Sequence, residues 1–361
     1  MNRLDAQKLA DLVGSPFAAR LVGAMPESAV IVSADERAAA ANKPALDLLP
    51  GLRVGDPLVL GLRAPDVIDA RRRVMASGEA ETVQWSERVP VERLFEVCVA
   101  PLATSDGEVV ATLITLRDQT EARRVERLRV DFIANASHEL RTPLASLLGF
   151  IETLQGSAHD DAKARDRFLA IMREQGRRMA RLIDDLLSLS RIEQKQHLRP
   201  ETAVDLAQTT RSVVDALTPM AKDLGLEIRL SAEQPVTVAG DRDELLRVAE
   251  NLIENAIKYG VRVDSDAAGV VDVVVSMTEK EGALTVRDYG HGIAPEHLPR
   301  LTERFYRVDA TQSRAKNGTG LGLAIVKHIL TRHRGRLTIT SRVNQGSSFV
   351  ATVPLHQTTK A

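Results

Sequence analysis

Residues 137–144 read Ser-His-Glu-Leu-Arg-Thr-Pro-Leu and lie in the first of two long segments with a helical repeat. The repeat runs through Ile133, Ser137, Leu140, Leu144, Leu147, Ile151 and Leu154, and then through Phe168, Met172, Gln175, Met179, Leu182, Leu186 and Leu189. Alternating steps of four and three residues predict two helices that pack along the seam of a bundle. The polar residues 156–163 predict a turn, so the helices should form an antiparallel hairpin. Because two helices bury only a narrow stripe, we expect a homodimer whose two hairpins complete a four-helix bundle.

His138 lies one position past that seam, so its ring is expected to point toward solvent. An imidazole with an ordinary pKa of about 6.5 is largely neutral at pH 7, and the neutral ring has a nucleophilic nitrogen. Glu139 could accept the proton of the other ring nitrogen, and Thr142, on the same helix face as His138, could position a water molecule. Pro143 cannot donate to the carbonyl of Glu139, which predicts a bend in the helix. A histidine on a helix is more often an ordinary surface residue, so the catalytic interpretation depends on the whole octet.

The composition of the 361-residue chain predicts two or three domains and excludes some classes of protein. Apolar residues make up 44% and aromatic residues 3%, so the cores must consist mainly of aliphatic side chains. With 48 basic and 49 acidic residues the net charge is −1, and no basic stripe for nucleic acid is evident. Cys98 is the only cysteine, so neither an intramolecular disulfide nor a cysteine-based zinc cluster can form. The longest apolar run, 109–116, is far shorter than the roughly 20 residues that span a bilayer, so we expect a cytoplasmic protein without a membrane span.

Changes of pattern along the chain predict its domain boundaries. The predicted segments are an N-terminal helix at 1–21, a small α/β module at 22–118, a connecting helix at 119–131, the helical hairpin at 132–197, a second α/β domain at 198–356 and a tail at 357–361. Within the first module we expect strands at 29–33, 94–100 and 109–116, the last two joined by a hairpin turn.

In the last domain, a helix predicted to begin near Asp241 places Asn251, Asn255 and Lys258 on one face. Asparagine oxygens suit Mg2+, a hard ion that bridges phosphates, and Asn255 is the candidate ligand. Lys258 could neutralise phosphate charge. Taken alone, this pattern is more often just the polar face of a helix.

Two glycine-containing motifs follow. After a predicted strand, Asp288 could accept a hydrogen bond from an adenine amino group, and Gly290 and Gly292 would let the backbone approach the ring. Next, Gly318-Thr319-Gly320-Leu321-Gly322-Leu323 opens a predicted helix, whose first N–H groups could bind phosphate. The spacing matches neither the dinucleotide fingerprint nor a P-loop, which disfavours a Rossmann enzyme and a P-loop ATPase.

The octet is identical to the phospho-acceptor box S-H-E-L-R-T-P-L of the histidine kinases. The later motifs resemble the Bergerat-type ATP site that histidine kinases share with Hsp90-like chaperones and type II topoisomerases. The resemblance covers residues from about 125 to 355 and is greatest to the phosphate-regulon sensor kinases (PhoR-like). It implies that Tyr259 also binds ATP, that residues 303–309 with Phe305 are the F box and lid, and that Arg304 or Arg307 contacts the γ-phosphate.

This resemblance implies a multidomain α+β protein. The module at 22–118 resembles a PAS domain in its strand pattern. The dimeric hairpin would follow, and then an α/β sandwich of the Bergerat (GHKL) type. Such a protein would use ATP and Mg2+ to phosphorylate His138, would pass the phosphoryl group to an aspartate of a response regulator, and would dephosphorylate that regulator with the help of Thr142. No nucleic-acid partner is expected, and a partner could associate the chain with a membrane. Two alternatives stay open: a GHKL-type ATPase clamp and a non-catalytic module that docks a partner.

Overall fold

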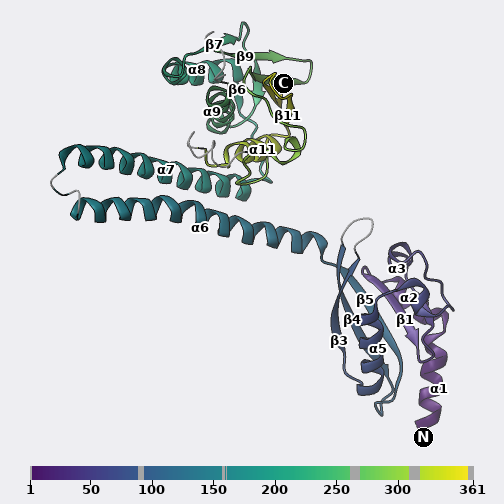
Figure 1. Cartoon of the computed structure of the whole chain (residues 1–361). Coiled ribbons are helices and arrows are strands. Elements are labelled where there is room, and N and C mark those ends of the chain that lie inside the picture. Colours follow the sequence, from purple (N-terminus) through teal and green to yellow (C-terminus); the bar gives the residue numbers. More distant parts are fainter. Residues whose placement is uncertain are drawn as a thin grey trace. The chain divides into compact units, whose positions relative to one another are not determined.

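The computed structural model describes residues 2–87, 93–156, 159, 161–260, 269–308 and 318–356. The chain forms two compact units, Met1–Asp131 and Phe132–Ala361 (Figure 1). Parts of the predicted turn and of the predicted lid, and the whole predicted tail, lie outside the described residues. In the described part of the chain, no helix combines the length and the apolar content needed to span a bilayer.

The first unit is built around an antiparallel sheet with the strand order β2-β1-β5-β4-β3. The strands are β1 (Ser28–Ser33), β2 (Ala38–Ala41), β3 (Glu81–Glu87), β4 (Arg93–Ala103) and β5 (Val109–Asp118). β1, β4 and β5 contain the three predicted strands, whereas β2 and β3 were not predicted. Val30 and Val32 of β1 join a core on one face of the sheet, and Ala29 and Ile31 join a core on the other.

Helices cover both faces of this sheet. The core with Val30 and Val32 includes side chains of α3 (Lys43–Leu48), α4 (Leu58–Gly61) and α5 (Pro65–Ser77). The other core includes side chains of α1 (Asn2–Val13) and α2 (Pro16–Gly23). The prediction of one helix at 1–21 is therefore wrong. The hydroxyl of Ser15 accepts the N–H of Ala18 and caps a second helix at Pro16, a residue that has no N–H to continue the first one.

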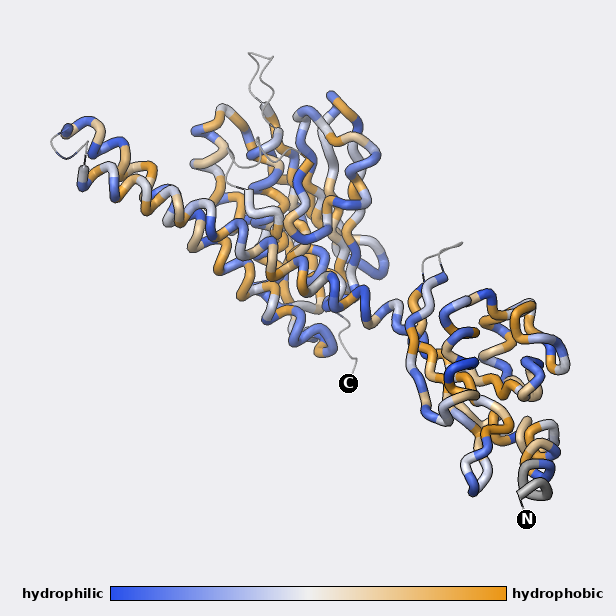
Figure 2. The backbone as a smooth tube through the Cα atoms, turned by 60° about the horizontal axis from the view of Figure 1, so that its bottom comes forward, coloured by the Kyte–Doolittle hydropathy of each residue, from blue (hydrophilic) through white to orange (hydrophobic). Residues whose placement is uncertain are grey.

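A long helical hairpin opens the second unit. α6 (Thr120–Gln155) begins in the first unit, so the predicted connecting helix and first bundle helix are one continuous element. α7 (Ala162–Gln194) returns beside it (Figures 1 and 2). Between the two helices, the ring centroids of Phe150 and Phe168 lie 5.1 Å apart. α6 continues through Pro143 without interruption, and the bend there stays a prediction.

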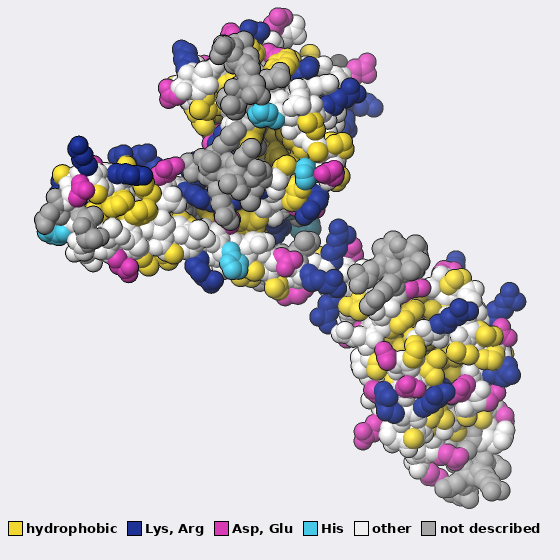
Figure 3. Space-filling view, viewed as in Figure 1, with side chains coloured by type: hydrophobic (Ala, Val, Ile, Leu, Met, Phe, Trp, Pro, Cys, Tyr) yellow, Lys and Arg dark blue, Asp and Glu magenta, His cyan; other side chains and the backbone are white. Residues whose placement is uncertain are grey.

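The hairpin buries one part of the predicted seam and exposes another. Leu182 and Leu189 are buried in the core that also contains the rest of the second unit. Large apolar side chains stay exposed along the hairpin, where Figure 3 shows yellow patches. These side chains are Ile133, Leu144, Leu148 and Ile151 on α6, and Leu169, Ile183 and Leu187 on α7.

The rest of the second unit is a two-layer α/β sandwich. Its main sheet has the order β11-β12-β10-β9-β7, in which β7 and β9 are parallel and the other pairs antiparallel. The strands are β7 (Leu226–Ser231), β9 (Gly269–Met277), β10 (Glu281–Asp288), β11 (Arg336–Ser341) and β12 (Ser347–Pro354), with a small sheet of β6 (Ala203–Asp205) and β8 (Thr237–Ala239). The helices are α8 (Leu206–Asp223), α9 (Arg242–Tyr259) and α11 (Gly322–Arg332), with a short 3-10 turn, η1, at Leu298–Arg300. Alternate valines of β9 pack against these helices in one continuous core, which supports the site described next.

Candidate functional site

Helix α9 places the predicted asparagines beside a cavity of about 420 Å3. The helix begins at its N-cap Asp241, whose carboxylate accepts two backbone N–H groups. Its apolar face is buried in the core, so the opposite face is available to the cavity. Asn251, Asn255, Lys258 and Tyr259 all line it, as their spacing predicts.

The polar groups on this face have oxygens and charges suited to a nucleotide with a hard metal ion. The side-chain amide of Asn251 donates to the carbonyl of Arg247 at 2.8 Å, which leaves its oxygen for other partners. Lys258 Nζ lies 2.7 Å from a carboxylate oxygen of Glu254, so Lys258 must exchange this partner to neutralise a phosphate. Burial raises the pKa of Glu250, which also lines the cavity.

Asp288 lies at the end of β10 and is only 4% exposed. Its Oδ1 accepts the N–H of Gly290 at 3.0 Å, and burial raises the pKa of the Asp288 carboxyl. A Cβ at Gly290 would overlap the carbonyl oxygen of Tyr259. Gly292 has φ +64°, and a Cβ there would overlap the carbonyl oxygen of Arg342. Both glycines are therefore required by close backbone contacts, although only Gly292 lines the cavity.

The glycine loop forms another wall of the cavity. Gly318, Thr319, Gly320, Gly322 and Leu323 line it. Helix α11 begins at Gly322, and the N–H groups of its first turn have no acceptor within the helix, which makes them an anion site. The side chain of Leu321 is fully buried in the core and the residue does not line the cavity, so its role in binding ATP stays a prediction.

Arg307 connects the cavity to the acceptor helix. Its guanidinium lines the cavity, is 8% exposed and donates to both oxygens of Glu139 at 3.3 and 3.1 Å. Arg178 of α7 donates to the same carboxylate at 3.1 Å. The predicted base, Glu139, is therefore held by two guanidinium groups, and we call these bonds the Glu139 contact.

Arg304 and Phe305 do not line the cavity. Arg304 forms an ion pair with Glu193 of α7 and lies 5.0 Å from the ring centroid of Phe132 of α6. Phe305 adopts φ +63°, and its ring centroid lies 5.8 Å from that of Phe132. These two residues therefore attach the sandwich to the hairpin, and their predicted role beside the nucleotide stays a prediction.

His138 is exposed, as predicted, and lies outside the cavity. Its ring has no hydrogen bond or ion pair to any described residue. The hydroxyl of Thr142 donates to the backbone carbonyl of His138 at 3.2 Å. The structure thus gathers most of the predicted nucleotide residues at one cavity and leaves the predicted acceptor accessible on α6.

Asp185 of α7 is a cavity residue that the sequence did not indicate. Its two carboxylate oxygens accept from Arg247 of α9 at 3.0 Å and from the hydroxyl of Thr319 at 2.9 Å, which we call the Asp185 contact. Arg247 could have been found from its position four residues before Asn251 on the same helix face. Asp185 could not, because only tertiary folding brings α7 to this wall.

Three family descriptions match consecutive parts of the chain. Residues 22–124 match the PAS fold, and residues 128–195 match the His Kinase A (phospho-acceptor) domain. Residues 240–357 match the histidine kinase-, DNA gyrase B-, and HSP90-like ATPase. The last match shows that the cavity belongs to an ATP-binding domain.

Curated relatives agree with these matches. The phosphate regulon sensor protein PhoR of Pseudomonas aeruginosa is 39% identical over 237 residues, which are 66% of this chain and 52% of that protein. The sensor protein kinase WalK of Staphylococcus saprophyticus is 36% identical over 261 residues, or 72% of this chain and 42% of that one. The chain thus spans about half the length of the curated relatives it matches. The solved structure of the histidine kinase AdeS of Acinetobacter baumannii is 26% identical and covers 61% of this chain and 98% of its own, with a TM-score of 0.47. Because a PAS fold, a phospho-acceptor domain and an ATPase domain follow one another in it, the chain belongs to the sensor histidine kinases.

Proposed function

We propose that this chain phosphorylates His138 with ATP and passes the phosphoryl group to an aspartate of a response regulator. One observation carries the proposal: Arg307, which lines the ATP-type cavity, is bonded to the carboxylate next to His138. An ATPase clamp would have no use for an exposed histidine in an acceptor box. A docking module without activity would not need an intact set of nucleotide residues around a cavity.

The cavity residues divide between the base and the phosphates of the nucleotide. Asp288 would accept a hydrogen bond from the adenine amino group, with the glycines beside it allowing close approach. The first turn of α11, the hydroxyl of Thr319 and the ammonium of Lys258 would hold the phosphates. Asn255 and the free oxygen of Asn251 fit Mg2+, which supplies charge neutralisation at the phosphates when bound.

Transfer requires the Glu139 contact to open. Once released from Arg178 and Arg307, the carboxylate of Glu139 can accept the proton from the ring of His138. A ring nitrogen then forms a bond to the γ-phosphorus while the bond from that phosphorus to the bridging oxygen breaks, and ADP leaves. The same opening frees the Arg307 guanidinium to stabilise charge on the transferring group.

The remaining partners follow from the exposed surfaces of the hairpin. The apolar side chains on α6 and α7 would pack against those of a second copy and complete a four-helix bundle. The receiver domain of a response regulator would take the phosphoryl group from His138, and Thr142 would take part in dephosphorylating it. Phosphate-dependent signalling is proposed from the relation to PhoR. We place the reaction in the cytoplasm, where ATP is available, and a partner could bring the chain to a membrane.

Incubation with γ-labelled ATP tests the proposal. Wild-type protein should acquire label that is lost in acid and stable in alkali, the behaviour of a phosphoramidate bond. His138→Gln should remain unlabelled, while Thr142→Ala should still be labelled because its hydroxyl serves the reverse reaction. Equal labelling of His138→Gln would contradict the proposal.

A further inference from the structure

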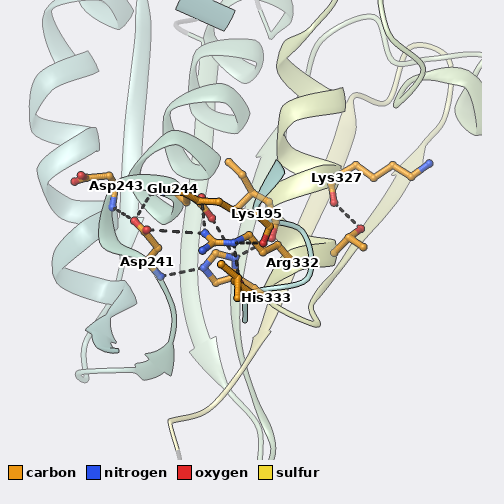
Figure 4. A network of polar contacts seen from close by, with 10 residues as sticks. Lys195, Asp241, Asp243, Glu244, Lys327, Arg332 and His333 are labelled. Atoms are coloured by element: carbon orange, nitrogen blue, oxygen red, sulfur yellow. Dashed lines mark hydrogen bonds and ion pairs between the residues drawn. The ribbon is translucent and has the colours of Figure 1, made fainter. Parts of the chain in front are cut away.

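Arg332, the last residue of α11, lies where the bundle joins the ATP-binding sandwich. Its side chain is 8% exposed, and its Nε donates to the carbonyls of Lys195 at 3.2 Å and Leu198 at 3.0 Å (Figure 4). Lys195 is the C-cap of α7, and Leu198 follows in the connection to the sandwich. Carbonyls at the end of a helix carry partial negative charge, so this cation stabilises the end of α7.

The other side of the Arg332 guanidinium faces the start of α9. Nη1 lies 2.5 Å from a carboxylate oxygen of Glu244 in the first turn and 3.9 Å from the N-cap Asp241. The first of these is an ion pair whose angles do not satisfy those of a hydrogen bond. The neighbouring His333 is fully buried, accepts the backbone N–H of Asp241 at 3.0 Å and bonds the carbonyl of Ile329 at 2.8 Å. One buried network therefore joins the ends of α7 and α11 to the beginning of α9 (Figure 4).

The helices that meet in this network also form walls of the cavity. α9 carries Asn251 and Asn255, and α11 begins with Gly322 in the glycine loop. Arg332 itself does not line the cavity and touches none of the proposed reacting groups. If α7 tilted at its C-terminal end, the guanidinium of Arg332 would move α9 and α11 with it, and both helices form walls of the cavity.

The Arg332 side chain is also more deeply buried than the side chains of the other ion pairs between α7 and the sandwich. In the Asp185 contact, the side chains of Asp185 and Arg247 are 20% and 31% exposed. Breaking the Arg332 contacts would leave the carboxylate of Glu244, whose side chain is 16% exposed, without its cation, which is costly away from water. The Asp185 contact can therefore open during a cycle while the Arg332 network holds.

We infer that Arg332 is a positioning residue: it is the pivot that holds the end of α7 on the two nucleotide-binding helices and so sets the approach of bound nucleotide to His138. The inference deepens the proposed kinase function and rests on it. Arg332 acts through α9 and α11, so its loss should slow transfer while leaving the binding of nucleotide intact.

The test uses Arg332→Met in the full chain, with Arg336→Met as the matched control. Arg336 is an exposed arginine that pairs with Glu281 at 2.8 Å and touches no residue of α7 in the described contacts. For Arg332→Met we expect the maximal rate of His138 labelling to fall about tenfold or more, because small misplacements of reacting groups have effects of that size. The KM and the Kd for ATP should change by less than about twofold, and Arg336→Met should label at the wild-type rate.

A double variant separates positioning from simple stability. Arg332→Met with Glu244→Leu removes the unpaired carboxylate and should recover the thermal midpoint, but the carbonyl contacts of Lys195 and Leu198 stay lost, so labelling should stay slow. Recovery of the rate together with the midpoint, or an unchanged rate in Arg332→Met, would overturn the pivot. Absence of label from the wild-type protein would instead refute the proposed function.

Discussion

The nucleotide cavity and the outer face of α6 differ in how firmly the fold holds their residues. In the cavity, Asp288 is 4% exposed and Gly292 is held against the backbone of Arg342. On α6, the ring of His138 is exposed and has no described partner. The packed core thus holds the proposed nucleotide-binding residues in place, whereas the proposed acceptor is exposed on a helix surface without such support. In the proposed mechanism the Glu139 contact joins the two regions, because Arg307 of the cavity bonds the carboxylate next to His138.

The same substitution in the two regions should have opposite effects, and this is the largest contrast we expect. Gly292→Ala forces a Cβ into the carbonyl of Arg342 at positive φ, so the free energy of unfolding should fall by more than about 2 kcal/mol and ATP binding should be lost. Gly149→Ala, in α6 with open space around it, should gain about 0.5–1 kcal/mol. Urea unfolding of both variants measures the difference. A tolerated Gly292→Ala would mean that the cavity is not rigid.

Removing the proposed metal ligand should lower the rate of phosphorylation without changing the stability of the fold. Asn255→Ala should lower the rate of labelling by at least about 100-fold, since an interaction with transferring phosphate is removed. The exposed acceptor helix does not depend on Asn255, so helix content and the thermal midpoint should stay near those of wild type. Normal labelling of this variant would show that the metal is held elsewhere.

Weakening the Asp185 contact should make the cavity more available to nucleotide. Asp185→Asn removes the carboxylate that holds Thr319 and Arg247, so ATP affinity should rise about three- to tenfold. Asp184→Asn is the matched control: it removes the same charge from the same wall, but the Asp184 side chain bonds no described side chain. Equal effects of the two substitutions in a fluorescent-nucleotide titration would mean that net charge alone matters.

The smallest effect concerns the pH dependence of stability and the buried His333. Burial lowers the pKa of His333, so the folded state keeps this ring neutral while the unfolded state takes up a proton below pH about 6.5. Stability is therefore lost as pH falls below that value, with a slope of at most about 1.4 kcal/mol per pH unit from this group. His333→Gln should flatten the slope between pH 5.5 and 6.5. Unfolding midpoints of the variant and of the wild type measured across that range check this, and an unchanged slope in His333→Gln would contradict the assignment.

Features that depend on residues close together in the chain could be predicted from the sequence. The spacing of Asn251 and Asn255 predicted a shared helix face, and the hairpin turn predicted the pairing of β4 with β5, because spacing and turn residues are set by neighbours in the chain. The break between α1 and α2 also has a local cause. Ser15 followed by Pro16 is a typical helix start, and the prediction of a single helix did not take it into account. The burial of the Leu321 side chain was not predicted, because the glycine motif does not specify which side of the loop faces the core.

The contacts that would regulate the reaction could not be predicted in this way. Glu139 meets Arg307 across 168 positions of sequence, and Asp185 meets Thr319 across 134. Neither pair has a period or spacing that marks it. Such contacts depend on how the hairpin and the sandwich pack, which is decided by the shared core around Leu182 and Leu189.

Locating the phosphoryl group after reaction with ATP tests the account most directly. The protein would be digested at neutral pH or above, and the phosphorylated peptide would be fragmented in a mass spectrometer. The account predicts one phosphoryl group on the peptide that contains residues 137–144, carried by the ring of His138. A phosphoryl group on any other residue, or hydrolysis of ATP without a modified peptide, would contradict it.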